Sequence, residues 1–303
     1  MKQSQLFCAM LLVALLAGPA HAQKACRLER FSEIPITTLP DGRFTVPVTL
    51  EGRTMNFLVD TGGVSAVVSR KQAMNLVLSH KTRFHRTPNH LLGVAGNKME
   101  LYVNIGKFSL GRLTGTNIPV YINERPMSDF DGILAPDMMR RFDVDIDLAR
   151  GTLSLFSQNH CPGQVVHWTR SGYVVLPMNV LLSGHIEVPV TIDGKKFTAL
   201  LDTGAQHSII SMSAARALGV SENSPDLKPI TDKNARYKAY DYPFKLLDFD
   251  GVAVSNPRFQ VVSDNFLPST RIDLIVGVSI LRRLHLYIAY GEEKLYITPA
   301  LAN

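Results

Sequence analysis

Residues 57–69 read FLVDTGGVSAVVS, and residues 199–211 read ALLDTGAQHSIIS. In both stretches an Asp-Thr-Gly tripeptide follows an apolar run typical of a β-strand and precedes a second short run rich in β-branched residues. The aspartates of the two tripeptides, Asp60 and Asp202, are 142 residues apart. Two copies of one unit can each bring a carboxylate to a pseudo-twofold axis, so these stretches predict two equivalent lobes that meet at the aspartates.

The repeat extends on both sides of the tripeptides with the same offset. Upstream, FTVPVTLEG at residues 44–52 aligns without a gap on IEVPVTIDG at residues 186–194. Both segments alternate like strands and end in Glu-Gly or Asp-Gly, which is a signal for a two-residue hairpin turn. Downstream, DGILAPDMMRRF at residues 131–142 aligns on DLIVGVSILRRL at residues 273–284. We therefore expect an internal duplication and an all-β fold of two β lobes with short helices.

Two carboxylates held face to face have a defined chemistry. Two like charges about 3 Å apart cannot both ionise easily, so the pair shares one proton. Such a pair can activate a water molecule, and a reaction with water as the nucleophile needs no bound cofactor. No metal site is expected either, because His80, His85 and His90 recur every five residues and match neither a helix face nor a strand face.

The first 22 residues have the features of a secretory signal peptide. Lys2 precedes an apolar stretch at residues 6–17, and Ala20-His21-Ala22 forms a small-x-small cleavage site. The apolar stretch is too short to span a bilayer comfortably, although an uncleaved anchor helix is the alternative. We expect an exported protein, most simply periplasmic and otherwise secreted, with no stable membrane anchor after cleavage.

Export would leave two cysteines in the mature chain, Cys26 and Cys161. In an oxidising compartment an even pair predicts one disulfide, and two free buried thiols are the alternative. The formal net charge of +6 specifies no partner. Nucleic-acid binding has no supporting motif and contradicts the export signal.

The repeat boundaries predict four parts of the chain. These are a signal peptide at 1–22, an N-terminal lobe with a leading strand at 23–160, an inter-lobe segment at 161–185 and a C-terminal lobe at 186–303. Between the upstream and downstream aligned segments the two repeats diverge. Only the first repeat has glycines at the expected hairpin tip, Gly93 and Gly96. Glycine permits unusual backbone angles, so this tip is a candidate for a mobile flap.

On these motifs the chain resembles the pepsin- and retropepsin-like aspartic peptidases, and in particular exported bacterial proteins with two such lobes in one chain. The resemblance covers nearly all of the mature sequence. It implies a bilobal fold with a substrate cleft between the lobes, a flap over the cleft and a monomer with pseudo-twofold symmetry. The expected activity is that of an aspartic endopeptidase acting on exported or envelope proteins or peptides.

The resemblance assigns roles residue by residue. Asp60 and Asp202 match the catalytic pair, in which one acts as a general base on water and the other donates a proton to the scissile carbonyl. Thr61 and Thr203 match the threonines that link the two loops across the axis. Gly62 and Gly204 match the glycines that allow the tight turn and whose N–H groups reach the carboxylates.

Two positions of the first lobe depart from the family pattern. Gly63 stands where the family usually has Ser, Thr or Ala, and Ala135 replaces a glycine in a crowded place. They leave open an inactive protein that binds extended peptides in the same cleft, or a structural β protein without a cleft function. Neither Gly63 nor Ala205 offers a hydroxyl to its aspartate, which predicts raised apparent pKa values and a pH optimum nearer mildly acidic to neutral.

His207 lies five residues after Asp202. It is either a hydrogen-bonded residue of the cleft wall or a contact to the substrate, and the first interpretation is favoured.

Overall fold

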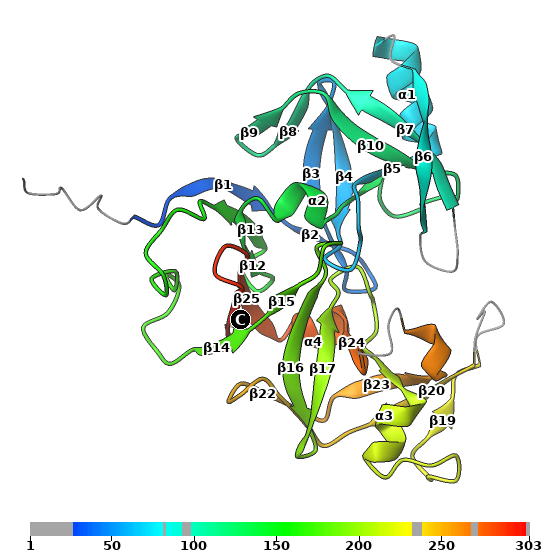
Figure 1. Cartoon of the computed structure of the whole chain (residues 1–303), viewed down its shortest axis with the longest axis vertical. Coiled ribbons are helices and arrows are strands. Elements are labelled where there is room, and N and C mark those ends of the chain that lie inside the picture. Colours follow the sequence, from blue (N-terminus) through cyan, green and yellow to red (C-terminus); the bar gives the residue numbers. More distant parts are fainter. Residues whose placement is uncertain (1–26, 81–82, 93–97, 232–237, 268–271, 301–303) are drawn as a thin grey trace, which may run out of the picture.

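The computed structural model describes residues 27–80, 83–92, 98–231, 238–267 and 272–300. Two lobes lie one above the other, and a third sheet runs beside the junction between them (Figure 1). Each lobe contains a ten-stranded sheet, and the third sheet has six strands. The predicted all-β, bilobal fold is confirmed. No helix in these described ranges is long and apolar enough to cross a bilayer.

The sheet of the first lobe has the strand order β6-β7-β10-β5-β11-β4-β3-β8-β9, with β2 paired to β3. Its strands are β2 (Thr37–Thr38), β3 (Phe44–Leu50), β4 (Arg53–Val59), β5 (Val67–Ser69), β6 (Phe84–Leu92), β7 (Lys98–Ile105), β8 (Phe108–Leu110), β9 (Leu113–Gly115), β10 (Ile118–Asn123) and β11 (Gly132–Leu134). Its helices are α1 (Arg70–His80) and α2 (Pro136–Met139).

The second lobe repeats this arrangement strand for strand in the order β19-β20-β23-β18-β24-β17-β16-β21-β22, with β15 paired to β16. Its strands are β15 (Asn179–Val180), β16 (Ile186–Ile192), β17 (Lys195–Leu201), β18 (Ile209–Ser211), β19 (Lys228–Pro229), β20 (Ala239–Pro243), β21 (Leu246–Asp248), β22 (Ala253–Ser255), β23 (Arg258–Val262) and β24 (Leu274–Val276). Its helices are α3 (Met212–Ala217), the 3-10 turn η2 (Asp264–Phe266) and α4 (Val278–Leu281).

The hairpins predicted from the repeat form in both lobes. β3 pairs with β4, and β16 pairs with β17, both antiparallel. Glu51 and Gly52 have φ of 49° and 80°, and Asp193 and Gly194 have φ of 46° and 86°. Two consecutive positive φ angles are the requirement of a type I′ turn, which matches the twist of the flanking strands.

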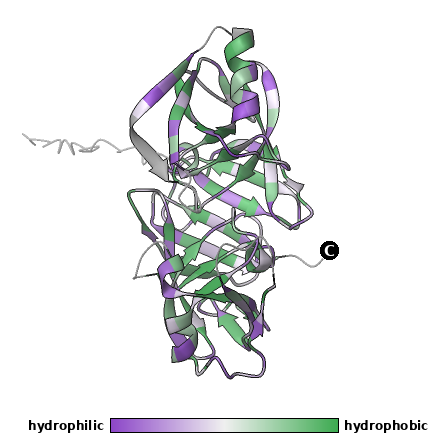
Figure 2. Ribbon diagram, turned by 90° about the vertical axis from the view of Figure 1, so that its right-hand side faces the viewer, coloured by the Kyte–Doolittle hydropathy of each residue, from purple (hydrophilic) through white to green (hydrophobic). Residues whose placement is uncertain are grey.

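Both lobes bury the same faces of their strands. Phe44, Val46, Val48 and Leu50 of β3 are fully buried, and so are alternate residues of β16. Alternating burial is what the period of two along a strand predicts. Hydrophobic residues run along the strands of both lobes in Figure 2, and the buried ones form one large cluster that extends through both lobes.

The six-stranded sheet joins the halves of the chain in the order β1-β13-β12-β25-β26-β14. Its strands are β1 (Arg30–Pro35), β12 (Asp143–Asp147), β13 (Thr152–Phe156), β14 (Val174–Pro177), β25 (Leu284–Ala289) and β26 (Lys294–Pro299). The central contact is antiparallel, between β12 of the first repeat and β25 of the second. The leading strand β1 pairs with β13 and therefore belongs to this shared sheet.

Contacts between histidine rings and aspartate carboxyl groups tie the segment after β13 to the shared sheet. His160 Nε2 lies 2.6 Å from Asp143 Oδ2, and His167 Nε2 lies 3.0 Å from Asp145 Oδ2. His285 Nε2 lies 2.5 Å from the other oxygen of Asp145, and the ring of Trp168 stacks on His285 at 4.3 Å. These contacts pair buried carboxylates that would otherwise be costly, and they hold the predicted inter-lobe segment against both halves of the sheet.

Candidate active site

Asp60 and Asp202 each lie at the end of a central strand. Asp60 follows β4, and its N–H donates to Leu134 O of β11 at 3.0 Å. Asp202 follows β17, and its N–H donates to Val276 O of β24 at the same distance. The neighbouring strand in each lobe runs parallel to the one that carries the aspartate. The backbone of each aspartate is therefore fixed by the sheet of its own lobe.

Thr61 and Thr203 connect the two loops through four hydrogen bonds. Thr61 Oγ1 donates to Leu201 O at 2.8 Å and accepts from Thr203 N at 3.0 Å. Thr203 Oγ1 donates to Val59 O at 2.8 Å and accepts from Thr61 N at 3.1 Å. Both threonines are buried. Because each hydroxyl bonds to the backbone of the opposite lobe, the two loops are held in one fixed geometry.

Gly62 and Gly204 let each loop approach the opposite aspartate. The N–H of Gly62 donates to Asp60 Oδ1 at 3.0 Å, and the N–H of Gly204 donates to Asp202 Oδ1 at 2.9 Å. A Cβ atom at Gly62 would lie 2.5 Å from Asp202 Oδ2, and one at Gly204 would overlap the Asp60 carboxyl group. Only glycine fits these positions while the aspartates stay where they are.

The two carboxyl groups are hydrogen-bonded to each other. Burial, the charge of Asp202 and this hydrogen bond raise the pKa of Asp60 well above its usual range. Burial also raises the pKa of Asp202, whereas the hydrogen bond from Asp60 opposes that rise. The pair therefore holds one proton over a range of pH in which isolated aspartates would both be ionised. Such a pair can act as a base and an acid at once.

The two departures in the first lobe face each other. A Cβ atom at Gly63 would lie 3.3 Å from the Cβ of Ala135 and 3.1 Å from Asp60 Oδ2. In the second lobe the two residue types are exchanged: Ala205 aligns with Gly63, and Gly277 aligns with Ala135. There a Cβ atom at Gly277 would lie 2.6 Å from the carbonyl oxygens of Ala205 and His207. Gly63 therefore leaves room for the methyl group of Ala135, whereas Gly277 is required by the backbone carbonyl groups beside it.

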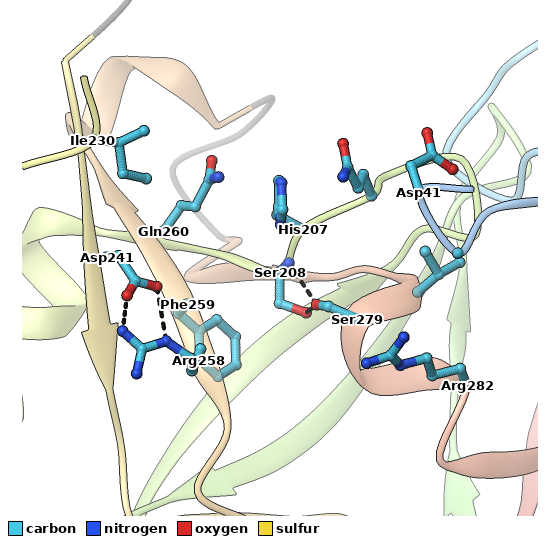
Figure 3. A pocket seen from close by; sticks show the side chains of 13 residues that line it. Asp41, His207, Ser208, Ile230, Asp241, Arg258, Phe259, Gln260, Ser279 and Arg282 are labelled. Atoms are coloured by element: carbon cyan, nitrogen blue, oxygen red, sulfur yellow. Dashed lines mark hydrogen bonds and ion pairs between the residues drawn. The ribbon is translucent and has the colours of Figure 1, made fainter. Parts of the chain in front are cut away.

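A pocket of about 540 Å³ opens directly after the Asp202 loop, between residues of the second lobe and Asp41 and Gly42 of the first repeat (Figure 3). His207 and Gln260 point to the same side of this pocket, and an ion pair between Arg258 and Asp241 lies along it. Arg282 lines the opposite part. The backbone below is fixed by Ser279 Oγ, which accepts from Ser208 N at 3.1 Å. His207 therefore lies in the wall of this pocket.

Two predicted features fall outside the described residues. Gly93 and Gly96 are among them, although the strands β6 and β7 that lead to them pair as an antiparallel hairpin. Cys26 is another, so its disulfide with Cys161 stays a prediction. Among the residues that the structure describes, no three His, Cys, Asp or Glu side chains form a group that could hold a metal ion.

Two residues of the site were not singled out from the sequence. His185 Nε2 lies 2.8 Å from Gly62 O. Asp137 accepts from Ala66 N with both oxygens, at 3.1 and 2.9 Å. Each stands where the two repeats have different residue types, since His185 aligns with Arg43 and Asp137 aligns with Ser279. A position-by-position comparison of the two copies would have found both.

The chain is similar to known proteins in sequence and in fold. A family model described as "Aspartyl protease" matches residues 46–137 and 188–280, one stretch in each lobe. A crystal structure of an aspartic proteinase from Irpex lacteus aligns with a TM-score of 0.55 and 12% identity over 88% of this chain and 97% of that chain, which shows a shared fold. A retropepsin-like aspartic protease from Rickettsia conorii aligns with a TM-score of 0.33 and 20% identity over 42% of this chain and 89% of that chain. No curated protein matches the sequence significantly.

Proposed function

Because the chain belongs to the aspartyl protease family, we propose that it is an endopeptidase that hydrolyses peptide bonds with a water molecule held between Asp60 and Asp202. The observation that carries this proposal is the four-bond connection between Thr61 and Thr203. It brings two carboxyl groups that are 142 residues apart into one hydrogen-bonded pair. A structural β protein has no need of such a pair, whose raised pKa values are an energetic cost.

The reaction uses both protonation states of the pair. The ionised carboxylate takes a proton from water as the water oxygen bonds to the carbonyl carbon, and the protonated carboxyl gives its proton to the carbonyl oxygen. In the second half the C–N bond breaks and the amine nitrogen takes up a proton from the pair. The hydroxyl proton of the intermediate returns to the other carboxyl, so the pair ends with the one proton it began with.

The substrate is proposed to be an extended segment of an exported or envelope protein. The signal-like residues 1–22 support export. The pocket after the Asp202 loop, with Arg258, Asp241 and Gln260 on its wall, supports a subsite for a polar side chain. If the chain is exported, the purified protein begins at Gln23, and mass spectrometry without reduction finds Cys26 linked to Cys161.

The raised pKa values of both aspartates also set the working pH. The pair needs one ionised aspartate, and burial shifts that ionisation to higher pH. The activity should therefore rise between mildly acidic and neutral pH. A rate that peaks below about pH 3, under the ordinary carboxyl pKa values, would contradict this.

The test is cleavage of an unstructured protein by the purified chain from Gln23 onward, scanned from pH 3 to 8, with Asp60→Asn and Asp202→Asn beside it. Cleavage that either substitution abolishes supports the proposal. Cleavage that survives both substitutions points to a contaminant. A folded wild type that binds peptides without cleaving them would instead establish the peptide-binding alternative.

A further inference from the structure

The residues that follow the two aspartate loops differ in polarity. With the repeat offset of 142, Gln206 of the second lobe aligns with Val64 of the first, and His207 aligns with Ser65. The Val64 side chain is 38% exposed, and Gln206 and His207 are exposed as well. At the same distance along the chain from its aspartate, the first lobe therefore presents an apolar side chain where the second presents an amide.

The strand beside these residues can be aligned through its hydrogen bonds. In the second lobe, Gln260 N of β23 donates to Ser208 O at 2.8 Å. In the first lobe, Tyr121 N of β10 donates to Ala66 O at 2.9 Å. Ser208 and Ala66 are aligned residues of the two repeats, so Gln260 is the structural equivalent of Tyr121.

The next strand of each sheet shows the same difference. Asp241 of β20 lies opposite Gln260, and Tyr102 of β7 lies opposite Tyr121. In the first lobe the ring centres of Tyr102 and Tyr121 are 6.1 Å apart, and His85 stacks on Tyr102 at 5.1 Å. Aromatic side chains of the first lobe thus stand where the second lobe has a carboxylate and an amide.

The pocket of about 540 Å³ lies among these polar residues of the second lobe, and we call it the Arg282 pocket (Figure 3). Its charged and amide-bearing side chains are Asp41, Gln206, Asp241, Arg258, Gln260 and Arg282.

Both carboxylates of the Arg282 pocket are already paired with arginines. Asp41 Oδ2 accepts from Arg43 Nε at 2.7 Å, and Asp41 Oδ1 accepts from Arg43 N at 3.0 Å. Asp241 accepts from Nη2 of Arg258 with one oxygen and from Nε at 3.3 Å with the other. Such charge-assisted bonds compensate the negative charge of a carboxylate. The two acidic side chains therefore oppose the entry of an anion only weakly.

Arg282 is the cation of the pocket that has no such partner. Its guanidinium forms no hydrogen bond or ion pair with any residue that the structure describes. It lies beside Gly42, where a Cβ atom would be 3.9 Å from Arg282 Nη1. The aligned residue of the first lobe, Arg140, instead donates from Nη1 to Leu182 O at 3.0 Å. The pocket thus contains one positive charge that no described carboxylate compensates.

The neutral side chains of the pocket add hydrogen-bond donors to this charge. The amides of Gln206 and Gln260 each carry two N–H groups, and the imidazole of His207 carries at least one. His207 and Gln260 point to the same side of the pocket (Figure 3). A guanidinium can bond to both oxygens of a carboxylate at once. A carboxylate is therefore the group whose charge and acceptor oxygens match this set of donors.

We propose that the Arg282 pocket binds an acidic side chain of the substrate, and that Arg282 is the residue that determines this specificity. The equivalent surface of the first lobe, formed by Val64, Tyr102 and Tyr121, takes an apolar side chain. The inference rests on the proposed peptidase function and names the substrate class of that site.

The duplication gives this specificity a direction. A substrate held between Asp60 and Asp202 crosses the axis that relates the two lobes, and the scissile bond lies at that axis. Equivalent subsites of the two lobes therefore bind residues on opposite sides of the scissile bond. An acidic residue is preferred on one side and an apolar residue at the same distance on the other.

The direct test is cleavage of a synthetic peptide pool in which every amino acid occurs at every position, with the products identified by mass spectrometry at about pH 6. Cleaved peptides should be enriched in Glu and Asp at one position on one side of the scissile bond, and in apolar residues at the matching position on the other. In single peptides that differ only at the acidic position, Glu should exceed Gln by about 5- to 20-fold in kcat/KM.

Variants of two neighbouring arginines show whether Arg282 causes this preference. Arg282→Gln should reduce the Glu-over-Gln ratio to about 2-fold or less, and Arg282→Glu should favour Lys at the same position. Arg283→Gln removes the same charge from the next residue, whose Nη1 donates to Ser255 O at 3.0 Å and which does not line the pocket. This control should keep the wild-type ratio.

The salt dependence of the wild type tests the same contact without a substitution. The Glu-over-Gln ratio should fall as the ionic strength rises from about 0.05 to about 0.5 M, because salt screens an ion pair that is open to solvent. If Arg282→Gln fails to fold, this measurement still decides: a ratio that does not change with salt contradicts recognition by charge.

Binding without cleavage separates this inference from the proposed function. Asp60→Asn leaves every residue of the Arg282 pocket in place, so affinity selection from the same peptide pool should retain peptides rich in Glu and Asp. Arg282→Gln in that background should remove the enrichment. A wild type that cleaves nothing while this selection succeeds refutes the proposed function and leaves the inference standing.

The inference is overturned if the selection shows no acidic enrichment, or if the wild type and Arg282→Gln have the same Glu-over-Gln ratio. Cleavage that depends on both aspartates but shows no acidic preference would leave the proposed function standing and refute the role of Arg282.

Discussion

The Asp60 loop and the Asp202 loop present their carboxyl groups in the same way but are supported differently. In the second lobe Ala205 N donates to Asp202 Oδ1 at 3.0 Å, and Ala205 O accepts from Val278 N. In the first lobe Gly63 N also donates to its aspartate, but Pro136 stands at the position of Val278 and has no N–H, and His185, between β15 and β16, lies 2.8 Å from Gly62 O. The Thr-Gly residues beside the carboxyl groups are identical in the two loops. Duplicated loops can thus change their outer supports as long as the contacts at the axis stay symmetrical.

The two lobes also differ in the side chain that supports the backbone after each loop. In the second lobe the Ser279 hydroxyl accepts from Ser208 N at 3.1 Å. In the first lobe the Asp137 carboxylate accepts from Ala66 N. Burial raises the pKa of Asp137 to about 6. A neutral hydroxyl group therefore supports this backbone in the second lobe, and a titratable carboxyl group supports it in the first.

The largest effect is expected at the symmetrical contact. Gly62→Ala and Gly204→Ala each place a methyl group into the opposite aspartate. Displacing a carboxyl group by about 1 Å can cost 100-fold or more in rate, so both variants should lose at least about that much kcat. Steady-state kinetics on one substrate checks this. A large loss in one variant and none in the other would break the symmetry claimed for the axis.

The next effect is the loss of the connection between the loops. Thr61→Val and Thr203→Val each remove one donor and one acceptor and leave two buried backbone groups without a partner. Each should lower the free energy of unfolding by about 2–4 kcal/mol. Denaturant unfolding measures it. The two costs should be nearly equal, and a difference above about 2 kcal/mol between them would contradict the account.

Asp137→Asn tests the titratable support. Because the folded-state pKa of Asp137 is raised from 3.8 to about 6, its contribution to stability is full below about pH 4 and is lost as the pH rises through about 6. Between pH 4 and 7 the wild type should lose about 1–3 kcal/mol of unfolding free energy more than the variant does. Ser279→Ala is the control and should keep the wild-type slope. Equal slopes in wild type and Asp137→Asn would refute the assignment.

The smallest effect is expected at Gly63 and Ala135, the two positions of the first lobe that depart from the family pattern. Gly63→Ala alone should cost about 1–2 kcal/mol because its methyl group would lie 3.1 Å from Asp60 Oδ2 and 3.3 Å from the Cβ of Ala135. Adding Ala135→Gly should recover about 0.5–1.5 kcal/mol in a double-mutant cycle. In the second lobe, Gly277→Ala meets carbonyl oxygens that Ala205→Gly does not remove. That pair should show little coupling, and equal coupling in both lobes would contradict this contrast.

Local signals in the sequence predicted the parts of the fold that depend on short stretches. The Glu51-Gly52 and Asp193-Gly194 turns formed as expected because two residues with positive φ determine a hairpin. The short helices expected in each lobe also formed, and the Ser211 hydroxyl accepts from Ala214 N at the start of α3. The equal offset of the repeats predicted two equivalent lobes before any contact was known.

Contacts between distant segments could not be read in the same way. Gly63 and Ala135 stand out in the sequence as two separate departures from the family pattern, because nothing in one copy of the repeat shows that the two positions touch. His185 has no local signal, since its partner is 123 residues away. The raised pKa values were expected from missing hydroxyls. Their direction is confirmed, but burial is the largest cause, and burial depends on the folded packing around the pair.

The most direct test of the central claim compares kcat/KM for Asp60→Asn, Asp202→Asn and the double variant on one cleaved substrate. One shared pair predicts that each single substitution loses about as much activity as the double, by analogy with other catalytic groups that act as a unit. Losses that multiply, or a single variant that keeps more than about one tenth of the wild-type rate, would show that the two aspartates do not work as one site.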